Sequence, residues 1–198
     1  MSTRSAAVLQ RIGADIDSTE FDRLVLAAME QIIPERSLPD PRRELSTSEI
    51  AVLEQGGFDL EPLPLNSTHP LIRSAAAYSA LLVSSLSVSQ AAARLHVEGS
   101  RIRQRLGERT LFGIKVKSIW RLPTFQFSEE GTVPGIEIVL PHLDPALHPL
   151  SVVGWFNTRN PDLLYGETEE PASPLDWLRA GRPAEPVSEL AGSLTELG

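Results

Sequence analysis

Hydrophobic residues recur at helical spacing along two long stretches near the beginning of the chain. In residues 18–33 they fall at positions i, i+3, i+4, i+7 and i+11, which predicts a helix with one buried face. Ser18 is the expected N-cap, and Pro34 ends this helix. From Pro70 onward a second helix is predicted, with the proline in its first turn. The two apolar faces consist of Phe21, Leu24, Val25, Ala28 and Ile32, and of Leu71, Ile72, Ala75, Tyr78, Leu82 and Val83.

A shorter helix is expected between these two. Ser46 and Glu49 have the spacing of a capping box, in which the side chain of each residue accepts a hydrogen bond from the backbone N–H group of the other. Gly56–Gly57 follows the apolar run and predicts a left-handed helix end.

The stretch from residue 87 to residue 106 has the spacing of a helix-turn-helix. A first helix around Ser89–Leu95 is expected to bury Ala92 and Leu95, and a second helix is expected to bury Ile102 and Leu106. The small side chain of Ala92 allows the helices to cross closely, and Ile102 fills the gap ten positions later.

The turn between these helices covers His96–Gly99. We expect Val97 to turn into the core and Ser100 to cap the second helix. His96 occupies the turn position that is often glycine.

The sequence after the helix-turn-helix changes twice. Ile114, Val116 and Ile119 lie among polar residues, and this alternation predicts a short strand pair. Beyond Phe127 the chain is proline-rich: ten of the 16 prolines lie in residues 122–198, which predicts several short helices. The expected fold class is mainly α, with a helix-turn-helix, a short wing-like β-hairpin and a C-terminal cluster of short helices.

Three segments are expected. Residues 1–69 form a helical N-terminal segment whose open roles are dimerisation and packing against the centre. Residues 70–127 form the helix-turn-helix module with its hairpin, and residues 128–198 form the module of short helices.

Composition limits the compartment and the chemistry. The chain lacks cysteine, which excludes disulfides and thiolate metal sites and fits a cytoplasmic protein. No apolar run reaches the length of a membrane helix, and the N-terminus lacks the apolar core of a signal peptide, so no membrane partner is expected.

The charge is distributed unevenly along the chain. The net charge is −8, yet residues 94–121 carry eight arginines and lysines against two glutamates. Acidic residues outnumber basic ones in both flanking segments. Such a distribution favours a polyanion at one place and repels it elsewhere.

The basic segment supplies side chains that suit DNA. Arginine can bind guanine and glutamine can bind adenine through paired hydrogen bonds, while hydroxyl groups and helix N-termini contact phosphates. Lysines on the strand pair would extend the contact as a basic wing. The candidate DNA-binding residues are Ser89, Gln90, Ser100, Arg101, Arg103, Gln104, Arg105, Lys115, Lys117 and Arg121. The competing interpretation is a solvated basic helix face, which is common in proteins that bind no DNA.

The C-terminal segment contains apolar residues for one small helical core, and it carries a recognisable motif. Trp155 is followed by Asn160–Pro161, then by the helix Pro174–Leu178 with Gly181 after it, and then by Val187–Leu190. This order resembles the toxin-binding domain of the Xre/MbcA/ParS antitoxin family. Residues 93–127 are also similar to the helix-turn-helix and hairpin of bacterial antitoxin-like DNA-binding proteins, including long antitoxins paired with PIN-type ribonucleases.

The resemblance implies a type II antitoxin that neutralises a cognate toxin and represses its own operon by binding promoter DNA. It implies a homodimer on a palindromic operator and a toxin of the RES or PIN type. The implied toxin-binding residues are Trp155, Phe156, Asn160, Leu175, Trp177, Arg179 and Arg182. Two alternatives remain: a stand-alone helix-turn-helix regulator whose C-terminal module binds another partner or effector, and an interaction module whose basic segment meets an acidic protein or RNA.

Enzymatic function is not expected. The four histidines do not form a helical i, i+4 pair, and no nucleophile motif accompanies His142, Asp144 and His148, which prolines separate. We expect these histidines to lie in turns with their hydrogen bonds satisfied. We expect no catalytic residue, no metal ligand and no cofactor.

Overall fold

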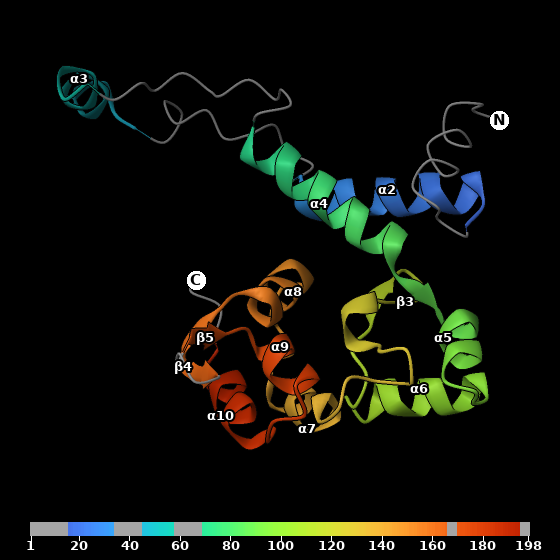
Figure 1. The fold of residues 1–198 in the computed structure, drawn as a ribbon. Helices are drawn as coiled ribbons and strands as arrows, with labels where there is room; N and C mark the ends of the chain where they lie inside the picture. The colour runs from blue at the N-terminus through green and yellow to red at the C-terminus, as the bar shows by residue number, and fades with distance from the viewer. Residues whose placement is uncertain (1–15, 34–44, 58–68, 166–169, 195–198) are drawn as a thin grey trace. The chain divides into compact units, whose positions relative to one another are not determined.

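Helices and a small antiparallel sheet make up most of the structure, so the predicted fold class is confirmed (Figure 1). The structure is a computed structural model that describes residues 16–33, 45–57, 69–165 and 170–194. It divides into two compact units, Met1–Ala80 and Leu81–Gly198. The predicted boundary between residues 127 and 128 lies inside the second unit.

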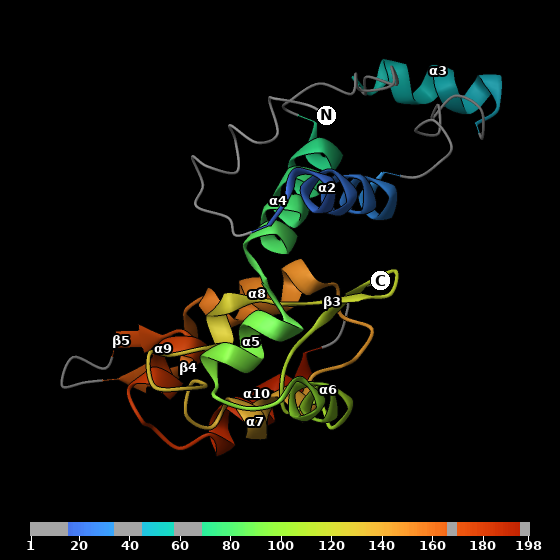
Figure 2. The same cartoon turned by 90° about the vertical axis from the view of Figure 1, so that its right-hand side faces the viewer.

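In the first unit, helix α2 (Ser18–Ile32) lies beside helix α4 (Pro70–Ser84) (Figures 1 and 2). Leu24 and Ala28 are fully buried, as the periodicity predicts. Burial raises the pKa of the Tyr78 phenol on α4, and a hydrogen bond with the Gln31 side chain offsets part of this shift. The expected cap at Ser18 is wrong, because Asp17 accepts the N–H groups of Thr19 and Glu20.

Helix α3 (Thr47–Gln55) begins with the predicted capping box. The Glu49 N–H group donates to Ser46 Oγ, and the Ser46 N–H group donates to the Glu49 carboxylate. The Ser46 hydroxyl group also donates to the Glu49 carboxylate, and this bond, together with that from the Ser46 N–H group, lowers the pKa of Glu49, because both stabilise its charged form. Gly57 follows with φ +82°, which confirms the left-handed end.

The second unit begins with the helix-turn-helix. Strand β1 (Leu86–Ser87) leads into α5 (Val88–Arg94), and the turn after α5 leads into α6 (Gly99–Gly107). Ala91, Ala92, Ile102 and Leu106 are buried. Leu95 is half-buried against the same cluster.

The predicted strand pair is present as β2 (Ile114–Val116) and β3 (Ile119–Leu122). The sheet order is β1-β3-β2, with antiparallel pairs throughout. Leu86 pairs with Leu122, so β1, which precedes the helix-turn-helix, is paired with β3, which follows it, and this pairing closes the motif. A short 3-10 turn, η2 (Thr124–Gln126), ends this part.

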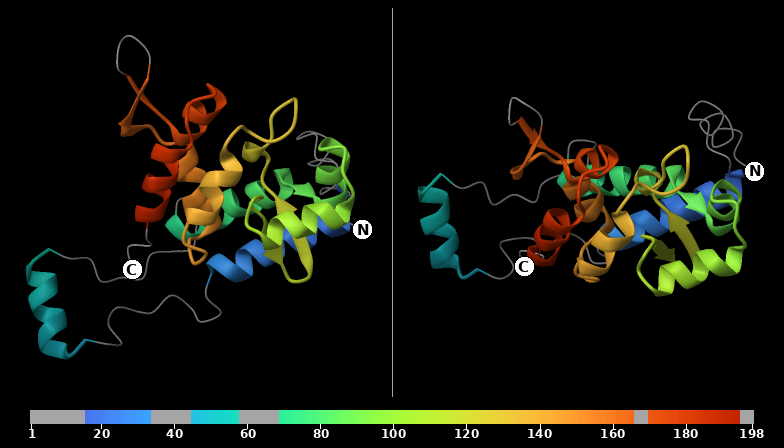
Figure 3. Two further views of the ribbon diagram at one scale, coloured as in Figure 1. Left: turned by 90° about the horizontal axis from the view of Figure 1, so that it is seen from below. Right: turned by 60° about the horizontal axis from the view of Figure 1, so that its bottom comes forward.

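The C-terminal part contains the short helices that the proline pattern predicts. They are α7 (Ile136–Val139), the 3-10 turn η3 (Leu140–His142), α8 (Pro149–Asn157), α9 (Pro174–Arg179) and α10 (Glu185–Ser193). An antiparallel hairpin of β4 (Asn160–Tyr165) and β5 (Glu170–Ala172) was not predicted. Figure 3 shows these strands extending from the helices.

Two apolar clusters hold the second unit. One lies within the helix-turn-helix and hairpin and includes Ile102, Leu122 and Phe127. The other lies among the C-terminal helices and includes Phe156 and Leu178. Phe112 and Phe125, which precede residue 128, also pack against the second cluster.

Candidate nucleic-acid interface

Helix α6 has one buried face and one solvent face. Ile102 and Leu106 point into the core, and at 3.6 residues per turn this places Ser100 and Gln104 on the opposite side. Both residues are exposed. The exposed face is therefore centred on Gln104, one of the predicted base-reading residues.

A chain of hydrogen bonds runs along this exposed face. Arg101 Nη1 donates to Gln104 Oε1 over 2.8 Å, and Gln104 Nε2 donates to Glu108 Oε1 over 2.7 Å. All three side chains are exposed. The chain holds the Gln104 amide in one orientation, because a guanidinium group can only donate and an ionised carboxylate can only accept.

Arg103 flanks the exposed face on the side of the hairpin turn. It lines a groove of ≈ 530 Å³ together with Ser89 at the start of α5, Gly99 at the start of α6 and Ser118 in the hairpin turn. Arg103 and both serines are exposed. The groove thus brings hydroxyl groups and a guanidinium together from three elements.

The opposite flank of α6 carries Arg105, which is less available than predicted. Its side chain is half-buried, and it donates to the carbonyl oxygen and the hydroxyl group of Thr110. Burial lowers the pKa of Arg105, and the nearby Glu137 carboxylate counteracts this shift. Arg105 therefore contributes charge beside the exposed face and lies outside its centre.

The hairpin adds two exposed lysines, as predicted. Lys115 lies 5.8 Å from the centre of the Trp120 ring, within the range of a cation–π contact. Lys117 lies in the turn between β2 and β3 and has φ +54°. These residues form the wing that the sequence predicts.

Arg121 is a correction to the predicted set. Its side chain is 1% exposed, and its guanidinium group donates to the carbonyl oxygens of Leu82 and Ser85 near the end of α4. A buried guanidinium in this position stabilises the fold and is not available to DNA. The expectation that Arg121 extends the basic wing is wrong.

At the start of α5, the two predicted contacts differ. Ser89 is exposed, whereas Gln90 completes a capping box in which its Oε1 atom accepts the Ser87 N–H group. Ser87 Oγ accepts the Gln90 N–H group in return. The Gln90 side chain therefore caps α5, which is a structural role and differs from the predicted contact with DNA.

The turn between α5 and α6 differs from expectation at two of its three assigned positions. His96 takes the left-handed conformation with φ +53°, as the glycine position of such a turn requires. Val97 was expected in the core but is 39% exposed. Ser100 does not cap α6, because the N-cap is Glu98, which makes no side-chain cap bond.

The predicted toxin-binding residues separate into core and surface. Phe156 and Leu175 are 0% and 2% exposed, so their assignment as direct contacts is wrong. Trp155 is half-buried and packs edge-on against the Phe156 ring at 4.8 Å. Asn160 is half-buried, and its Oδ1 atom accepts the Asp162 N–H group.

Three predicted residues lie together near the end of α9. Trp177 is half-buried, and its Nε1–H group donates to the Pro183 carbonyl oxygen. The Arg182 guanidinium lies 5.5 Å from the centre of the Trp177 ring. Arg179 and Arg182 are exposed. This is the part of the predicted toxin-binding set that a partner can reach.

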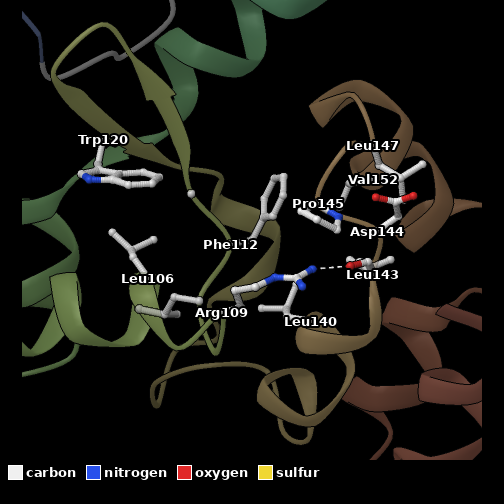
Figure 4. Close-up of a pocket in the computed structure, with 12 residues that line it drawn as sticks. Leu106, Arg109, Phe112, Trp120, Leu140, Leu143, Asp144, Pro145, Leu147 and Val152 are labelled. Carbon is white, nitrogen blue, oxygen red and sulfur yellow. Dashed lines mark hydrogen bonds between the residues drawn. The ribbon is translucent and has the colours of Figure 1, made fainter. Parts of the chain in front are cut away.

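A cavity of ≈ 250 Å³ lies where the helix-turn-helix and hairpin meet the C-terminal helices (Figure 4). Leu106 and Trp120 line one side, and Leu143 and Val152 line the other. Arg109 crosses the junction and donates to the Leu143 carbonyl oxygen. The side chain that follows α6 thus joins the two parts of the second unit.

His69 and His148 each accept, through Nδ1, the N–H group two residues later, at the start of α4 and α8. Within the ranges described, no group of three or more His, Cys, Asp or Glu side chains is placed to hold a metal ion. No helix in those ranges is both long enough and apolar enough to span a membrane.

Two residues of this region were missed by sequence reasoning. Glu108 was counted only as an acid within the basic segment, although its i+4 spacing from Gln104 is a signal for a helix-surface pair. Gln126 is fully buried and bonds both the N–H and the C=O group of Phe112. No local signal distinguishes Gln126 from an exposed glutamine.

Comparison with known proteins identifies no family. No protein-family model matches the sequence, and no curated protein matches it significantly. The NMR structure of Rv2175c is similar to 55% of this chain over 79% of its own length, with 22% identity and a TM-score of 0.41.

Proposed function

We propose that this protein binds double-stranded DNA as a transcription regulator, through the exposed face of α6 and the turn of the β2–β3 hairpin. The observation that carries the proposal is the centring of this face on Ser100 and Gln104, with Arg101 and Arg103 on its two sides. The basic segment lies in a chain of net charge −8, which disfavours nonspecific coating of DNA by the whole protein.

The exposed residues divide into two roles. Gln104 lies at the centre of the face with Arg101 beside it, and both are suited to base edges in the major groove. Arg103 lies beside the hairpin, and Lys115 and Lys117 lie on it. These three side chains are suited to phosphates, because each phosphate contact adds to affinity through counterion release.

The test is duplex binding measured by fluorescence anisotropy, on a site selected from a random library and on random DNA. Lys117→Ala is expected to weaken binding to both duplexes equally and to reduce the salt slope by about 1. Gln104→Ala is expected to reduce the preference for the selected site. Arg159→Ala, an exposed arginine of the C-terminal part, is the matched control.

Equal wild-type affinity for selected and random DNA would contradict the regulator proposal. Competition by RNA or by an acidic protein, with no duplex binding, would instead favour the interaction-module alternative.

A finer proposal is that the protein is the antitoxin of a type II system. It rests on the resemblance of residues 155–190 to the Xre/MbcA/ParS toxin-binding domain. It is also supported by acidic character, since residues 122–198 carry three arginines against twelve acidic residues. A segment of this charge complements a basic active site that handles RNA or a nucleotide, as in PIN-type or RES-type toxins.

The antitoxin proposal is tested by co-expression with the small protein encoded next to its gene. Rescue of growth from that protein, lost on deletion of residues 128–198, is the expected result. Trp177→Ala with Arg182→Ala should weaken rescue while DNA binding is retained, whereas Arg159→Ala should leave both intact. Full rescue by the deleted chain would contradict the assignment of toxin binding to residues 128–198, whereas no rescue by the full chain would favour a stand-alone regulator. A homodimer is proposed on the same basis, with half-sites about one helical turn apart.

A further inference from the structure

Glu108 is an acidic residue on a surface that we propose to meet a polyanion. It is exposed at the end of α6, and it lies beside the glutamine at the centre of the solvent face. An unpaired carboxylate there would weaken attraction to DNA of every sequence. Its presence therefore calls for a reason other than affinity.

The hydrogen-bond chain supplies that reason. Gln104 Nε2 donates to Glu108 over 2.7 Å, while Gln104 Oε1 accepts from Arg101 over 2.8 Å. Reversing the amide would place two donors against each other at Arg101 and two acceptors against each other at Glu108. The amide acceptor is thus held toward the N-terminus of α6 and the amide donor toward its C-terminus.

The orientation of this amide matters for sequence reading. Glutamine recognises adenine by accepting from N6 and donating to N7, so a reversed amide presents the wrong atom to each position. We infer that Glu108 is a specificity-determining residue, which positions the Gln104 amide for one orientation of an adenine edge. This inference rests on the proposed DNA-binding function. It adds Glu108 to the interface and specifies the direction in which the Gln104 amide faces a base.

Two variants separate positioning from charge. Glu108→Gln removes the charge but keeps a side-chain oxygen that can accept from Gln104 Nε2. Glu108→Ala removes both. The control is Glu98→Ala, which removes one negative charge at the other end of α6 from a side chain that makes no cap bond.

The measurement is the ratio of dissociation constants for random DNA and for the site selected by the wild-type full chain. Glu108→Ala is expected to lower this ratio about tenfold, the low end of the discrimination that a paired base contact provides. Glu108→Gln and Glu98→Ala are expected to keep the ratio within about twofold, while both variants bind random DNA somewhat more tightly because one negative charge is lost.

The outcomes are distinct. An unchanged ratio in Glu108→Ala overturns the inference, because Glu108 then acts only as a charge. An equal loss in Glu108→Gln also overturns it, because the carboxylate then acts by itself and not through Gln104. A wild-type protein that binds no duplex overturns the proposed function and this inference with it. Thermal melting followed by circular dichroism is expected to be unchanged in all three variants, since both glutamates are exposed.

Discussion

The two parts of the second unit differ in the residues that occupy left-handed backbone positions. Within the described part of residues 81–127, these positions carry His96, Arg109 and Lys117. Within the described part of residues 128–194, they carry Gly131, Gly135 and Gly181. A side chain in this conformation costs roughly 1–2 kcal/mol relative to glycine, so the first part retains strain that the second part avoids.

The same contrast holds for the buried anchors. The helix-turn-helix and hairpin bury a guanidinium, Arg121, against backbone carbonyl groups. The C-terminal helices bury an aromatic ring, Phe156, which contacts the rings of Phe125 and Trp155. Polar side chains thus take structural positions in the part that we propose to bind DNA, whereas apolar burial and glycine turns hold the other part.

The apolar anchor should give the largest effect. Phe156→Ala is expected to lower the free energy of unfolding by about 3–5 kcal/mol, because a fully buried ring leaves a cavity. Trp177→Ala, which removes a half-buried ring, is expected to cost roughly 1–2 kcal/mol. Urea denaturation measures both. Equal losses would mean that the assignment of Phe156 to the core and of Trp177 to the surface is wrong.

The polar anchor should come next. Arg121→Ala is expected to cost about 3 kcal/mol, because it leaves the carbonyl oxygens of Leu82 and Ser85 without this donor in a buried site. Arg121→Lys should recover part of this loss, since an ammonium group keeps the charge but cannot reproduce the guanidinium geometry. Arg101→Ala is the exposed control, expected to change stability by less than about 0.5 kcal/mol. A loss in Arg121→Ala as small as in this control would contradict the structural role.

Gly135 and Gly181, two of the left-handed glycines of the C-terminal part, provide a matched pair. A Cβ atom at Gly135 would lie 3.0 Å from Ala184 Cβ, whereas one at Gly181 would meet nothing within 4 Å. Gly181→Ala should therefore cost only the strain of the left-handed backbone, about 1 kcal/mol. Gly135→Ala should cost about 1 kcal/mol more, because it adds crowding to the strain. Thermal unfolding of both variants tests this order, and the reverse order would show that the space at residue 135 can relax.

The smallest effect is a gain. His96→Gly is expected to stabilise the protein by up to about 1 kcal/mol, because it relieves left-handed strain at an exposed turn. Arg109→Gly relieves similar strain but also removes the hydrogen bond to Leu143, so its net effect should be smaller. Destabilisation by His96→Gly would show that the imidazole contributes more to the turn than the strain costs.

Local pattern predicts much of this fold. The helices, the α3 capping box and the burial of Ile102 and Leu106 follow from spacing and capping chemistry, which act within a few residues. The features that were missed depend on distant partners. Arg121 is buried because α4 presents carbonyl groups to it, and the β4–β5 hairpin requires pairing between segments that prolines interrupt.

The candidate site was predictable to a similar degree. Helical periodicity separated the solvent face of α6 from its core face, so Ser100, Arg101 and Gln104 are exposed as expected. The C-terminal motif was less informative about contacts. Phe156 and Leu175 were assigned as contacts on the basis of the resemblance, but both lie in the core, and a motif that defines a fold need not list the residues that a partner touches.

The closure of the helix-turn-helix by β3 has a consequence for the order of folding. The Ser85 carbonyl oxygen accepts from Arg121, which lies 36 residues further along the chain, and Leu86 pairs with Leu122. Neither contact can form before those later residues are present. During synthesis from the N-terminus, α5 and α6 therefore emerge before the strand that secures β1 and the end of α4. A nascent chain that ends after α6 holds both helices of the motif but none of this closure, and the motif is complete only once Leu122 has been added.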